Sequence, residues 1–547
     1  MGKPFGPEPQ GRRLDVEVTR TADSKFGDFS TNVALKASRG NKSFDKAQDK
    51  QSPMEFAKVL ADSLQKQPYL KKLEVVKPGF INIFIKEEYW QKQVEDVLKQ
   101  SSEYGSNSLG KGKKARVEFV SANPTGPLHF GNARGGPIGD CLASILELSG
   151  YKVIREYLHN DVGGQVAKLG RSIINVAIGQ KLENQEYKGE YILDLINKIK
   201  KISNFKFQIS NSGEAGEKAV EIILKQIIKD TKEMGVNYDK IYHESEFIKS
   251  KQTENVLEDL KKKGFLRQNE GATWFAPNDQ FLRDRECVVI KSDGDYTYFA
   301  NDIAYHKLKF AEGYDLVIDI LGANHHGHVP RLKAAVDAVG FDPSKFYVIL
   351  YQWVRFKRGA EVVKMAKRAG TFITAKEVLD EVGRDAVRFF ILSHDANSHI
   401  DFDLSLASEK SSKNPVYYVQ YAYARISSIL AKSEVRSQKS EVSYERLTTN
   451  YELNLIKQIT RLPELVADIA GNFAVHRLTG YAIDLADSFH KFYENCRVIP
   501  ARNASHSDAG GGEKEDLMRA RIGLITATKI ALANTLKLLG VSAPEKM

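Results

Sequence analysis

The chain has few cysteines, and no motif pairs them. Its three cysteines, Cys141, Cys287 and Cys496, lie far apart, and none belongs to a C-x-x-C motif. This pattern excludes a disulfide framework and a cysteine-based zinc site, and it fits a reducing compartment.

Long apolar runs are also missing. No stretch approaches the roughly 18 to 20 apolar residues that a membrane-spanning helix needs. The start, Met1 to Pro7, has no apolar core of the kind a signal peptide carries. We therefore expect a cytoplasmic protein that is not bound to a membrane.

The composition is that of an ordinary soluble globular protein, which excludes fibrous and wholly disordered classes. Hydrophobic residues make up 42%, charged residues 27%, and the mean hydropathy is −0.38. The 547 residues are enough for roughly three to four domains of ordinary size. Eighty Lys and Arg against 70 Asp and Glu give a net charge of +10, which favours a polyanionic partner if the excess is clustered.

Three regions follow from the pattern along the chain. Residues 1–110 are predicted to form a small α/β domain, with a helix carrying Phe56, Leu60 and Leu64 and a strand within Lys77 to Phe84. Residues 411–547 are predicted to form a helical bundle. Its last helix would place Ile525, Leu532, Leu536 and Leu539 near one face and end at Gly540.

Residues 111–410 read as an α/β domain. A strand at Arg116 to Val120 is followed by a helix spaced as Ile138, Leu142 and Ile145, and then by a strand at Tyr151 to Ile154. A helical stretch at about 166–285 interrupts this pattern, and strands resume at Cys287 to Ile290 and Leu316 to Ile320. The predicted fold is a Rossmann-like, doubly wound parallel sheet split by a helical insertion. The glycine-rich 105–112 resembles a phosphate-binding loop, but it lacks the Ser or Thr that should follow Lys111.

The first strand runs into a loop rich in proline and glycine, and a helix is expected to begin near His129. Unpaired backbone N–H groups at such a strand-to-helix junction bind anions. The imidazole of His129 can donate to phosphate oxygens, and Gly131 lets a flat ring or ribose approach the backbone. Taken alone, an H-x-G is more often a helix-capping loop that contains a satisfied histidine.

A second basic motif lies far downstream. Lys364 and Lys367 sit three residues apart in a predicted loop before a helix that carries Val378 and Leu379. Two lysines can neutralise a pyrophosphate leaving group. A basic loop of this kind, taken alone, is usually a solvent-exposed surface loop without a function. The functional interpretation therefore depends on its occurrence together with the upstream H-x-G-N.

Together these motifs resemble those of class I aminoacyl-tRNA synthetases, with HFGN at 129–132 and KMAKR at 364–368. Further stretches resemble arginyl-tRNA synthetases in particular: SANPTGPLHFGNARGG from Ser121, YLHNDVGGQV from Tyr157, DGDYTYFANDIAYH from Asp293, LGANHHGHVPRLKAA from Leu321 and RAGTFITAKEVLDEVGRDAVRFF from Arg368. GDFSTNVALK from Gly27 resembles that family's additional N-terminal domain, and the helices up to APEKM resemble its anticodon-binding bundle.

The resemblance implies that arginine is activated with ATP and transferred to tRNA(Arg), and it assigns site residues by position. The catalytic residues would be His129, Asn132, Lys364 and Lys367, and ATP would also contact Pro124, Thr125, Gly126, Gly131 and Met365. Arginine would be bound by Glu118, Ser121, Asn123, Tyr298, Asp302 and His325. The sequence departs from the family's signatures at Asn132, in place of the second histidine, and at Ala366, in place of a serine.

The resemblance also implies the cofactors and partners. ATP would enter with Mg²⁺ held mainly by phosphates and water. We expect no protein-bound structural metal, because His325, His326 and His328 lack an acidic or second ligand pair at a suitable spacing. The partners would be tRNA(Arg), arginine and ATP, and we expect a monomer.

Two other classes of function stay open at this point. A small-molecule nucleotidylyltransferase also uses H-x-G-H on a doubly wound sheet, but it would need neither the helical bundle nor the N-terminal domain. An RNA-binding paralogue without catalysis would not need His129, Lys364 and Lys367. An ATP–pyrophosphate exchange assay with arginine and tRNA separates all three.

Overall fold

A computed structural model describes residues 16–40, 52–202, 205–277, 281–282, 286–363, 373–433, 442–499 and 511–547. The chain forms two compact units. One unit comprises Met1–Lys99, Ser437–Lys457 and Asn495–Leu524, and the other comprises Gln100–Arg436, Gln458–Glu494 and Ile525–Met547.

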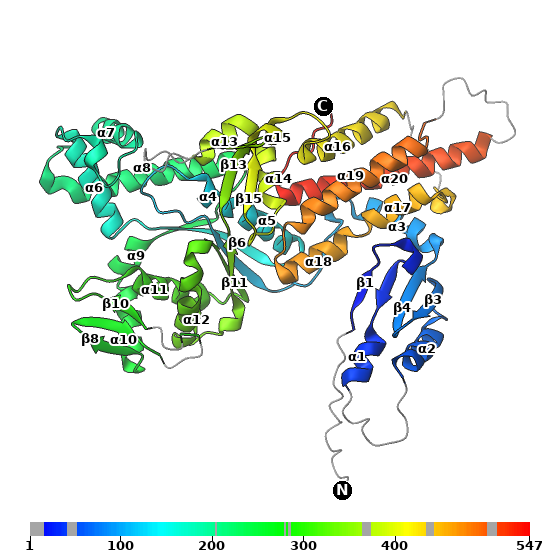
Figure 1. The fold of residues 1–547 in the computed structure, drawn as a ribbon, viewed down its shortest axis with the longest axis horizontal. Coiled ribbons are helices and arrows are strands. Elements are labelled where there is room, and N and C mark those ends of the chain that lie inside the picture. The colour runs from blue at the N-terminus through cyan, green and yellow to red at the C-terminus, as the bar shows by residue number, and fades with distance from the viewer. Residues whose placement is uncertain are drawn as a thin grey trace, which may run out of the picture. The chain divides into compact units, whose positions relative to one another are not determined.

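The N-terminal part of the first unit is a four-stranded antiparallel sheet with two helices packed on it (Figure 1). The strand order is β1-β2-β4-β3, and Ala34, Ala57, Ala61 and Ile81 form its core. The elements are β1 (Val18–Arg20), β2 (Phe29–Thr31), α1 (Val33–Gly40), α2 (Pro53–Leu64), β3 (Leu70–Val76), β4 (Phe80–Ile85) and α3 (Glu87–Gln100). The predicted helix and strand are both present as α2 and β4.

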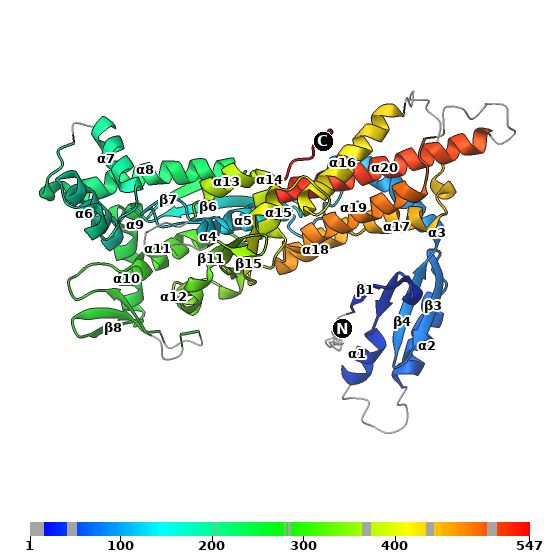
Figure 2. The same cartoon turned by 45° about the horizontal axis from the view of Figure 1, so that its top comes forward.

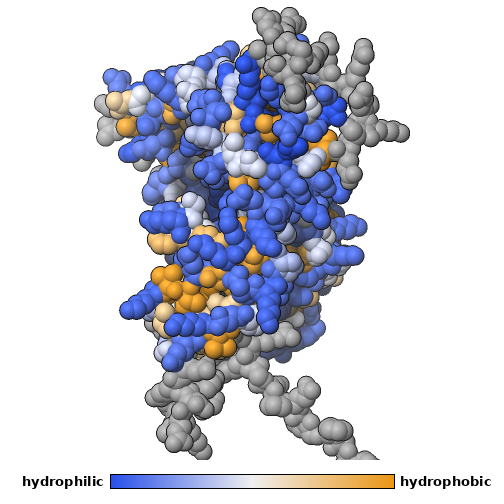
Figure 3. Space-filling model, turned by 90° about the vertical axis from the view of Figure 1, so that its right-hand side faces the viewer, coloured by the Kyte–Doolittle hydropathy of each residue, from blue (hydrophilic) through white to orange (hydrophobic). Residues whose placement is uncertain are grey.

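Two segments from late in the chain complete this unit. Lys457 forms an ion pair 2.6 Å long with Asp28, and the Gln91 side chain donates to the Leu447 carbonyl over 3.0 Å. Hydrophilic residues dominate the face shown in Figure 3, with apolar residues gathered toward its lower part. Val59, Val76 and Phe80 are among the unit's exposed apolar side chains.

A five-stranded parallel sheet forms the centre of the second unit. Its order is β12-β11-β5-β6-β7. Strands β5 and β11 are neighbours: β6 and β7 follow β5 toward one edge of the sheet, and β12 follows β11 at the other edge. Helices cover this sheet (Figure 2). The strands are β5 (Lys114–Phe119), β6 (Lys152–His159), β7 (Lys240–His243), β11 (Leu316–Gly322) and β12 (Phe346–Tyr351). The predicted doubly wound parallel sheet is confirmed.

The helices between these strands include the predicted α5 (Gly135–Leu148), which follows the short α4 (Phe130–Ala133). Its apolar side chains Ile138, Leu142 and Ile145 are buried. The chain then turns at Gly150, whose φ of +89° is in the left-handed region that glycine favours.

The segment between β6 and β10 differs from the expected helical insertion in two ways. It contains helices α6 (Gly164–Ala177), α7 (Tyr191–Ile202) and α8 (Ser212–Glu233), but β7 pairs with β6 as a strand of the main sheet. The predicted strand at Cys287–Ile290, β10, does not return to the main sheet. It pairs instead in an antiparallel sheet of order β10-β9-β8 with β8 (Leu266–Asn269) and β9 (Ala272–Phe275). A short edge strand with polar ends, such as Lys240–His243, carries too weak a pattern to be recognised in sequence.

The other elements before residue 414 lie between the strands of the main sheet or between that sheet and the C-terminal helices. They are α9 (Glu244–Lys249), α10 (Gln252–Lys262), α11 (Tyr298–Ala311), α12 (Val329–Ala338), β13 (Val354–Arg358), β14 (Glu361–Val362), α13 (Ala375–Val382), α14 (Arg384–Leu392), β15 (Ile400–Asp403) and α15 (Leu404–Ser408). Strands β14, β13 and β15 form a small sheet of their own. Thr374 and Glu377 form a capping box that starts α13.

The rest of the chain is helical, as predicted. The helices are α16 (Pro415–Lys432), α17 (Asn450–Ile459), α18 (Leu462–Asn472), α19 (Arg477–Asn495) and α20 (Gly511–Leu539). Contrary to the expectation from sequence, α20 contains a stretch long and apolar enough to cross a membrane, with a mean hydropathy of 1.3. Most of that stretch is buried, including Leu532 and Leu536, as in the core helix of a soluble protein.

Arg388 on α14 joins four parts of the second unit. Its buried guanidinium donates to the Leu539 carbonyl over 2.7 Å, to the carbonyls of Met234 and Gly235 over 3.3 Å, and to Asp140 over 2.7 Å. Gly540 follows with a φ of +65°, and a Cβ there would lie 2.3 Å from the Arg388 guanidinium. The end of α20 is therefore fixed against the helices that surround the main sheet.

Candidate active site

A cavity of about 570 Å³ opens at the carboxyl ends of β5 and β11. These neighbouring strands are where the strand order reverses, and in doubly wound sheets ligands bind in the crevice at this point. The cavity brings together seven of the residues predicted to bind arginine or ATP: Glu118, Ser121, Asn123, Asn132, Tyr298, Asp302 and His325.

The backbone that follows β5 has an unusual conformation. Val120 and Ser121 have φ angles of 70° and 36°, which non-glycine residues and β-branched ones in particular rarely adopt. The Ser121 hydroxyl accepts a hydrogen bond from the Leu158 backbone N–H over 3.0 Å and so ties this turn to β6. Strained backbone of this kind is concentrated at functional sites, where the surroundings hold it in place.

The loop between β5 and α4 is held by two side chains. Asn123 accepts a hydrogen bond from Asn160 over 3.2 Å, and the Tyr191 hydroxyl donates to the Thr125 carbonyl over 2.8 Å. Pro124 is buried, and Gly126 packs near the Tyr191 ring. The loop is thus fixed in position before any ligand binds.

His129 is the N-cap of α4, as the sequence predicts. Its Nδ1 accepts a hydrogen bond from the Gly131 N–H over 2.8 Å, so the neutral ring carries its proton on Nε2. Burial lowers the pKa of His129, which favours this neutral form. A Cβ at position 131 would lie 2.9 Å from Nδ1, so the glycine of H-x-G is what allows this cap.

The second basic motif is flanked by residues that lie beside His129. The Phe130 N–H donates to the Ile373 carbonyl over 3.1 Å, and His129 forms a β-bridge with Thr374. Lys364, Met365 and Lys367 themselves lie outside the described residues.

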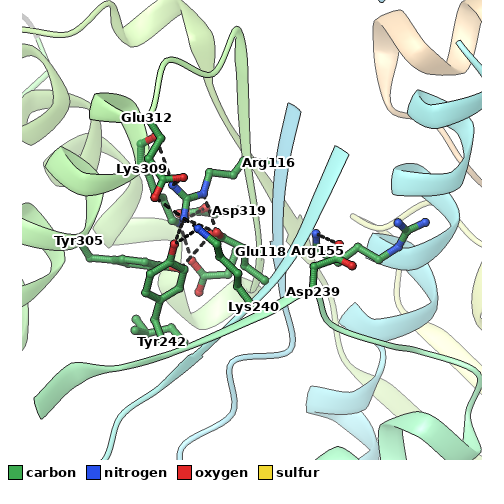
Figure 4. A network of polar contacts seen from close by, with 12 residues as sticks. Arg116, Glu118, Arg155, Asp239, Lys240, Tyr242, Tyr305, Lys309, Glu312 and Asp319 are labelled. Atoms are coloured by element: carbon green, nitrogen blue, oxygen red, sulfur yellow. Dashed lines mark hydrogen bonds and ion pairs between the residues drawn. The ribbon is translucent and has the colours of Figure 1, made fainter. Parts of the chain in front are cut away.

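Glu118 is not alone at the base of the cavity. The buried ammonium of Lys309, on α11, lies 2.5 Å from Glu118 Oε2 and 2.6 Å from Asp319 Oδ1 (Figure 4). Burial alone would lower the pKa of Lys309, but Asp319 and Glu118 outweigh that effect and raise it. For Asp319, burial raises the pKa, while Lys309 and His306 together lower it well below the usual range. Lys309 and Asp319 are therefore both charged at neutral pH.

A second buried ion pair lies beneath this one. Arg116, two residues before Glu118 on β5, pairs with Glu156 on β6. It also donates to the Tyr242 hydroxyl over 2.9 Å (Figure 4). The Tyr305 hydroxyl donates to Glu156 over 3.2 Å. Because residues two apart on a strand face the same side, Arg116 and Glu118 belong to one continuous polar layer.

Helix α11 presents one face to the cavity. Tyr298, Asp302, Tyr305 and Lys309 recur at helical spacing, and the first three line the cavity. Asp302 Oδ2 lies 2.9 Å from His328 Nε2, and His306 bridges the Asp302 carbonyl and Asp319. His328 is thus a partner of the predicted arginine-binding carboxylate, while His325 also lines the cavity.

Glu244, at the start of α9, also lines the cavity and was not predicted. One of its oxygens accepts from Asn301 over 2.7 Å, and the other has no hydrogen-bond partner among the described residues. Burial, together with Asp302 and Asp161, raises the pKa of Glu244 to about 8. The signal available in sequence was one glutamate directly after a weak strand, which is too common to single out.

The charges of the cavity favour a cation on one side and an anion on the other. Glu118, Asp319 and Asp302 place three carboxylates on the α11 side of the cavity, against the two cations Lys309 and Arg331. The loop from Asn123 to Asn132 presents instead the N-terminus of α4 and the proton of His129. The arrangement can therefore hold a guanidinium and a polyphosphate beside each other.

Three family models match the chain. They are the catalytic domain of class I tRNA synthetases (R) over residues 93–403, the arginyl-tRNA synthetase N-terminal domain over 6–85, and the DALR anticodon binding domain over 419–547.

Relatives and solved structures match over nearly the whole length. The arginine–tRNA ligase of Geobacter sp. (strain M21) is 40% identical over 545 residues, which are 97% of this chain and 95% of the relative. That of Caldanaerobacter subterraneus is 40% identical over 548 residues, 97% and 94% respectively. The arginyl-tRNA synthetase structure of Thermus thermophilus has the same fold, with a TM-score of 0.76 at 21% identity and 97% of this chain and 96% of that chain covered.

Proposed function

Because this chain belongs to the arginyl-tRNA synthetase family and is an arginine–tRNA ligase, we propose that arginine and ATP react in the cavity at the ends of β5 and β11. The arginine carboxylate attacks the α-phosphate, and pyrophosphate leaves. A hydroxyl of the terminal tRNA ribose then attacks the carbonyl of arginyl-adenylate, and AMP leaves. The observation that carries the proposal is the pairing of an anionic pocket with a proton-donating N-cap at the sheet's switch point.

Asp302 and Glu118 receive the guanidinium. A planar guanidinium donates in a fork that suits carboxylates. Asp302, held by His328, offers a partly exposed carboxylate to the cavity, and Glu118 is held in place by its ion pair with Lys309. Tyr298 and His325 form the rim, while Asn123 and Ser121 face the amino and carboxylate end of the substrate.

His129 donates through Nε2 to the phosphates of ATP, and Asn132 adds a side-chain amide at the same edge. Preorganised donors of this kind stabilise charge that develops in the transition state. Pro124, Thr125, Gly126 and Gly131 shape the loop against the nucleotide. Lys364 and Lys367, with Met365 between them, neutralise the leaving pyrophosphate, and the anchoring of Ile373 and Thr374 next to His129 supports this role.

Mg²⁺ enters with ATP, held by phosphate oxygens and water, and needs no cage of protein ligands. The protein is soluble, and we assign it to the cytoplasm and to a monomeric state.

The helices after residue 414 bind the anticodon stem-loop of tRNA(Arg). There the Tyr417 and Tyr421 rings stack, and the Arg425 guanidinium lies 4.8 Å from the Tyr421 ring and 4.7 Å from the Tyr493 ring. Half-buried rings beside a cation are typical platforms for unpaired bases.

The test is ATP–pyrophosphate exchange with arginine, in the presence and absence of tRNA(Arg), followed by charging of the tRNA. Exchange that depends on arginine and disappears with lysine or citrulline is the expected result. Pyrophosphate exchange without any amino acid, or with a different nucleotidyl acceptor in place of arginine, would contradict the assignment of the cavity to arginine.

A further inference from the structure

His159, the last residue of β6, is buried without a hydrogen-bond partner. Its side chain has no exposed surface, and neither ring nitrogen has a partner among the described residues. Buried polar groups are almost always paired, so an imidazole left in this state points to an interaction that the protein chain itself does not supply.

A second histidine and a glutamate surround this ring. His243 ends β7 and is the register partner of His159 on the neighbouring strand, with the two ring centroids 5.1 Å apart. Glu221 on α8 faces both, with Oε1 3.9 Å from His159 Nε2 and 3.7 Å from His243 Nδ1. One ligand atom from each of the three residues lies within 4.8 Å of the other two.

The surroundings of the three residues supply further negative charge. Asp161 Oδ2 lies 3.4 Å from His243 Nδ1, and Asp161 is itself held by the backbone N–H and the hydroxyl of Ser245 over 2.8 and 2.7 Å. Carboxylates at metal sites are commonly hydrogen-bonded in this way. Two carboxylates balance the charge of a divalent cation.

We propose that His159, His243 and Glu221 bind a zinc ion, with Asp161 beside them. Two imidazoles and carboxylate oxygens are the donor set that suits Zn²⁺, whereas Mg²⁺ and Ca²⁺ prefer oxygen ligands alone. Nothing in the arginine–tRNA ligase reaction requires this ion.

The ion would fasten the insertion helix α8 to the edge of the catalytic sheet. Leu158, Asn160 and Glu244, the neighbours of the two histidines in sequence, line the cavity, whereas His159 and His243 do not. Because successive strand residues face opposite sides, the zinc cluster lies across the sheet edge from the cavity wall. Zinc therefore acts as a structural tie behind that wall and does not contact arginine or ATP.

The experiment measures metal binding by the full-length protein after treatment with a chelator. Zn²⁺ is titrated against a competing chromophoric chelator, and Co²⁺ is titrated while visible absorption is recorded. The variants are Glu221→Gln, which is exposed and should not disturb folding, and His243→Gln. Glu217→Gln removes the same charge one turn earlier on α8, and His326→Asn removes a histidine from the histidine-rich loop, so these two serve as controls.

We expect one equivalent of Zn²⁺ in the wild type and in both controls, with absorption typical of tetrahedral Co²⁺. Loss of a partner behind a metal ligand weakens binding about 10- to 100-fold, so loss of the ligand Glu221 or His243 should weaken it at least as much. Zinc should also raise the thermal midpoint of the wild type and leave that of Glu221→Gln unchanged. Equal binding by Glu221→Gln and wild type, loss of binding in His326→Asn, or no zinc binding by the wild type would each overturn the proposal, whatever the charging activity.

Discussion

The ammonium of Lys309 lies 2.5 Å from Glu118 Oε2, and both side chains are buried. The carboxylate that the sequence assigns to the substrate guanidinium is therefore already engaged by a lysine of the protein. Lys309 also contacts Asp319 over 2.6 Å, so one cation holds two acidic side chains at the base of the cavity. It acts as a positioning residue, because it fixes Glu118 without touching the reacting atoms.

Replacement of Lys309 by methionine should destabilise the protein by about 3–5 kcal/mol, because two buried carboxylates lose their counter-charge. Urea unfolding measures this loss. Lys307→Met removes a lysine of the same helix whose partner, Asp259, is exposed, and exposed pairs contribute only about 0–1 kcal/mol. Equal stability of the two variants would show that Lys309 does not hold the network together.

His129→Ala should slow adenylate formation by about 10² to 10³, the usual cost of removing one preorganised donor to developing charge. Pyrophosphate exchange measures the rate, and tRNA binding, measured separately, should change little. His326→Ala is the matched control, because His326 is exposed and does not line the cavity. A rate within threefold of wild type in folded His129→Ala would remove His129 from the ATP site.

Asp302→Asn keeps the shape of the side chain but removes its charge. It should raise the KM for arginine steeply and narrow the preference for arginine over citrulline, with little change in the KM for ATP. Sites that pair a buried polar group with its substrate reach about 10⁴ to 10⁵ in discrimination, so there is ample preference to lose. Steady-state kinetics on both amino acids measure this preference. A preference for arginine over citrulline equal to that of the wild type would show that Asp302 pairs with His328 and does not bind the guanidinium.

Arginine binding should become tighter as the pH rises toward about 8. Glu244 has a pKa raised to about 8 by burial, so most of it is protonated at pH 7. A bound guanidinium lowers that pKa, and binding then releases a proton. The affinity should gain up to about tenfold per pH unit below 8 and level off above it.

Calorimetric titration of arginine from pH 6.5 to 9 checks this dependence. Glu244→Gln cannot release the proton and should show a flatter profile, while Glu246→Gln, on the exposed side of the same helix, should follow the wild type. Identical slopes for Glu244→Gln and wild type would exclude Glu244 as the source of the proton.

Tyr421→Ala should weaken the interaction with tRNA by about 1–3 kcal/mol if an anticodon base stacks there. The KM for tRNA in charging assays measures this, with pyrophosphate exchange at saturating tRNA as the readout for the active site. Tyr347→Ala removes an exposed tyrosine of the catalytic part and serves as the control. Loss in both variants to the same extent would indicate a general effect on folding.

Local signals in the sequence were sufficient for the first βα junction. The proline and glycine between β5 and α4, and the H-x-G itself, specify a loop and an N-cap through contacts only a few residues apart. Lys309 could have been found as well, because it shares one face of a helix with Tyr298 and Asp302, beside apolar positions such as Ile303 and Phe310. A lysine on such a face needs a buried partner.

Other features depend on contacts that no local pattern encodes. Glu244 acquires its raised pKa only because the fold buries it and brings it near Asp302 and Asp161, which outweighs the opposite effect of the hydrogen bond from Asn301. Strand β10 leaves the main sheet because β9 offers it an antiparallel edge. Short strands such as β7 and β10 carry four residues each, too few to show which sheet they will join. Sequence pattern therefore located the first βα junction and seven residues that line the cavity, but neither Glu244 nor the sheet that β10 joins.

The four-way bonding of Arg388 has a consequence for biosynthesis. A nascent chain emerging from the ribosome has its complete parallel sheet once β12 is out, yet the Leu539 carbonyl that Arg388 binds is made almost 190 residues after β12 ends at Tyr351. Until then the guanidinium can reach only Asp140 and the carbonyls of Met234 and Gly235. The contacts of Arg388 around the catalytic sheet are therefore completed only after the last helix has been synthesised. Premature termination anywhere in α20 releases a chain in which the Arg388 guanidinium lacks one of its hydrogen-bond acceptors.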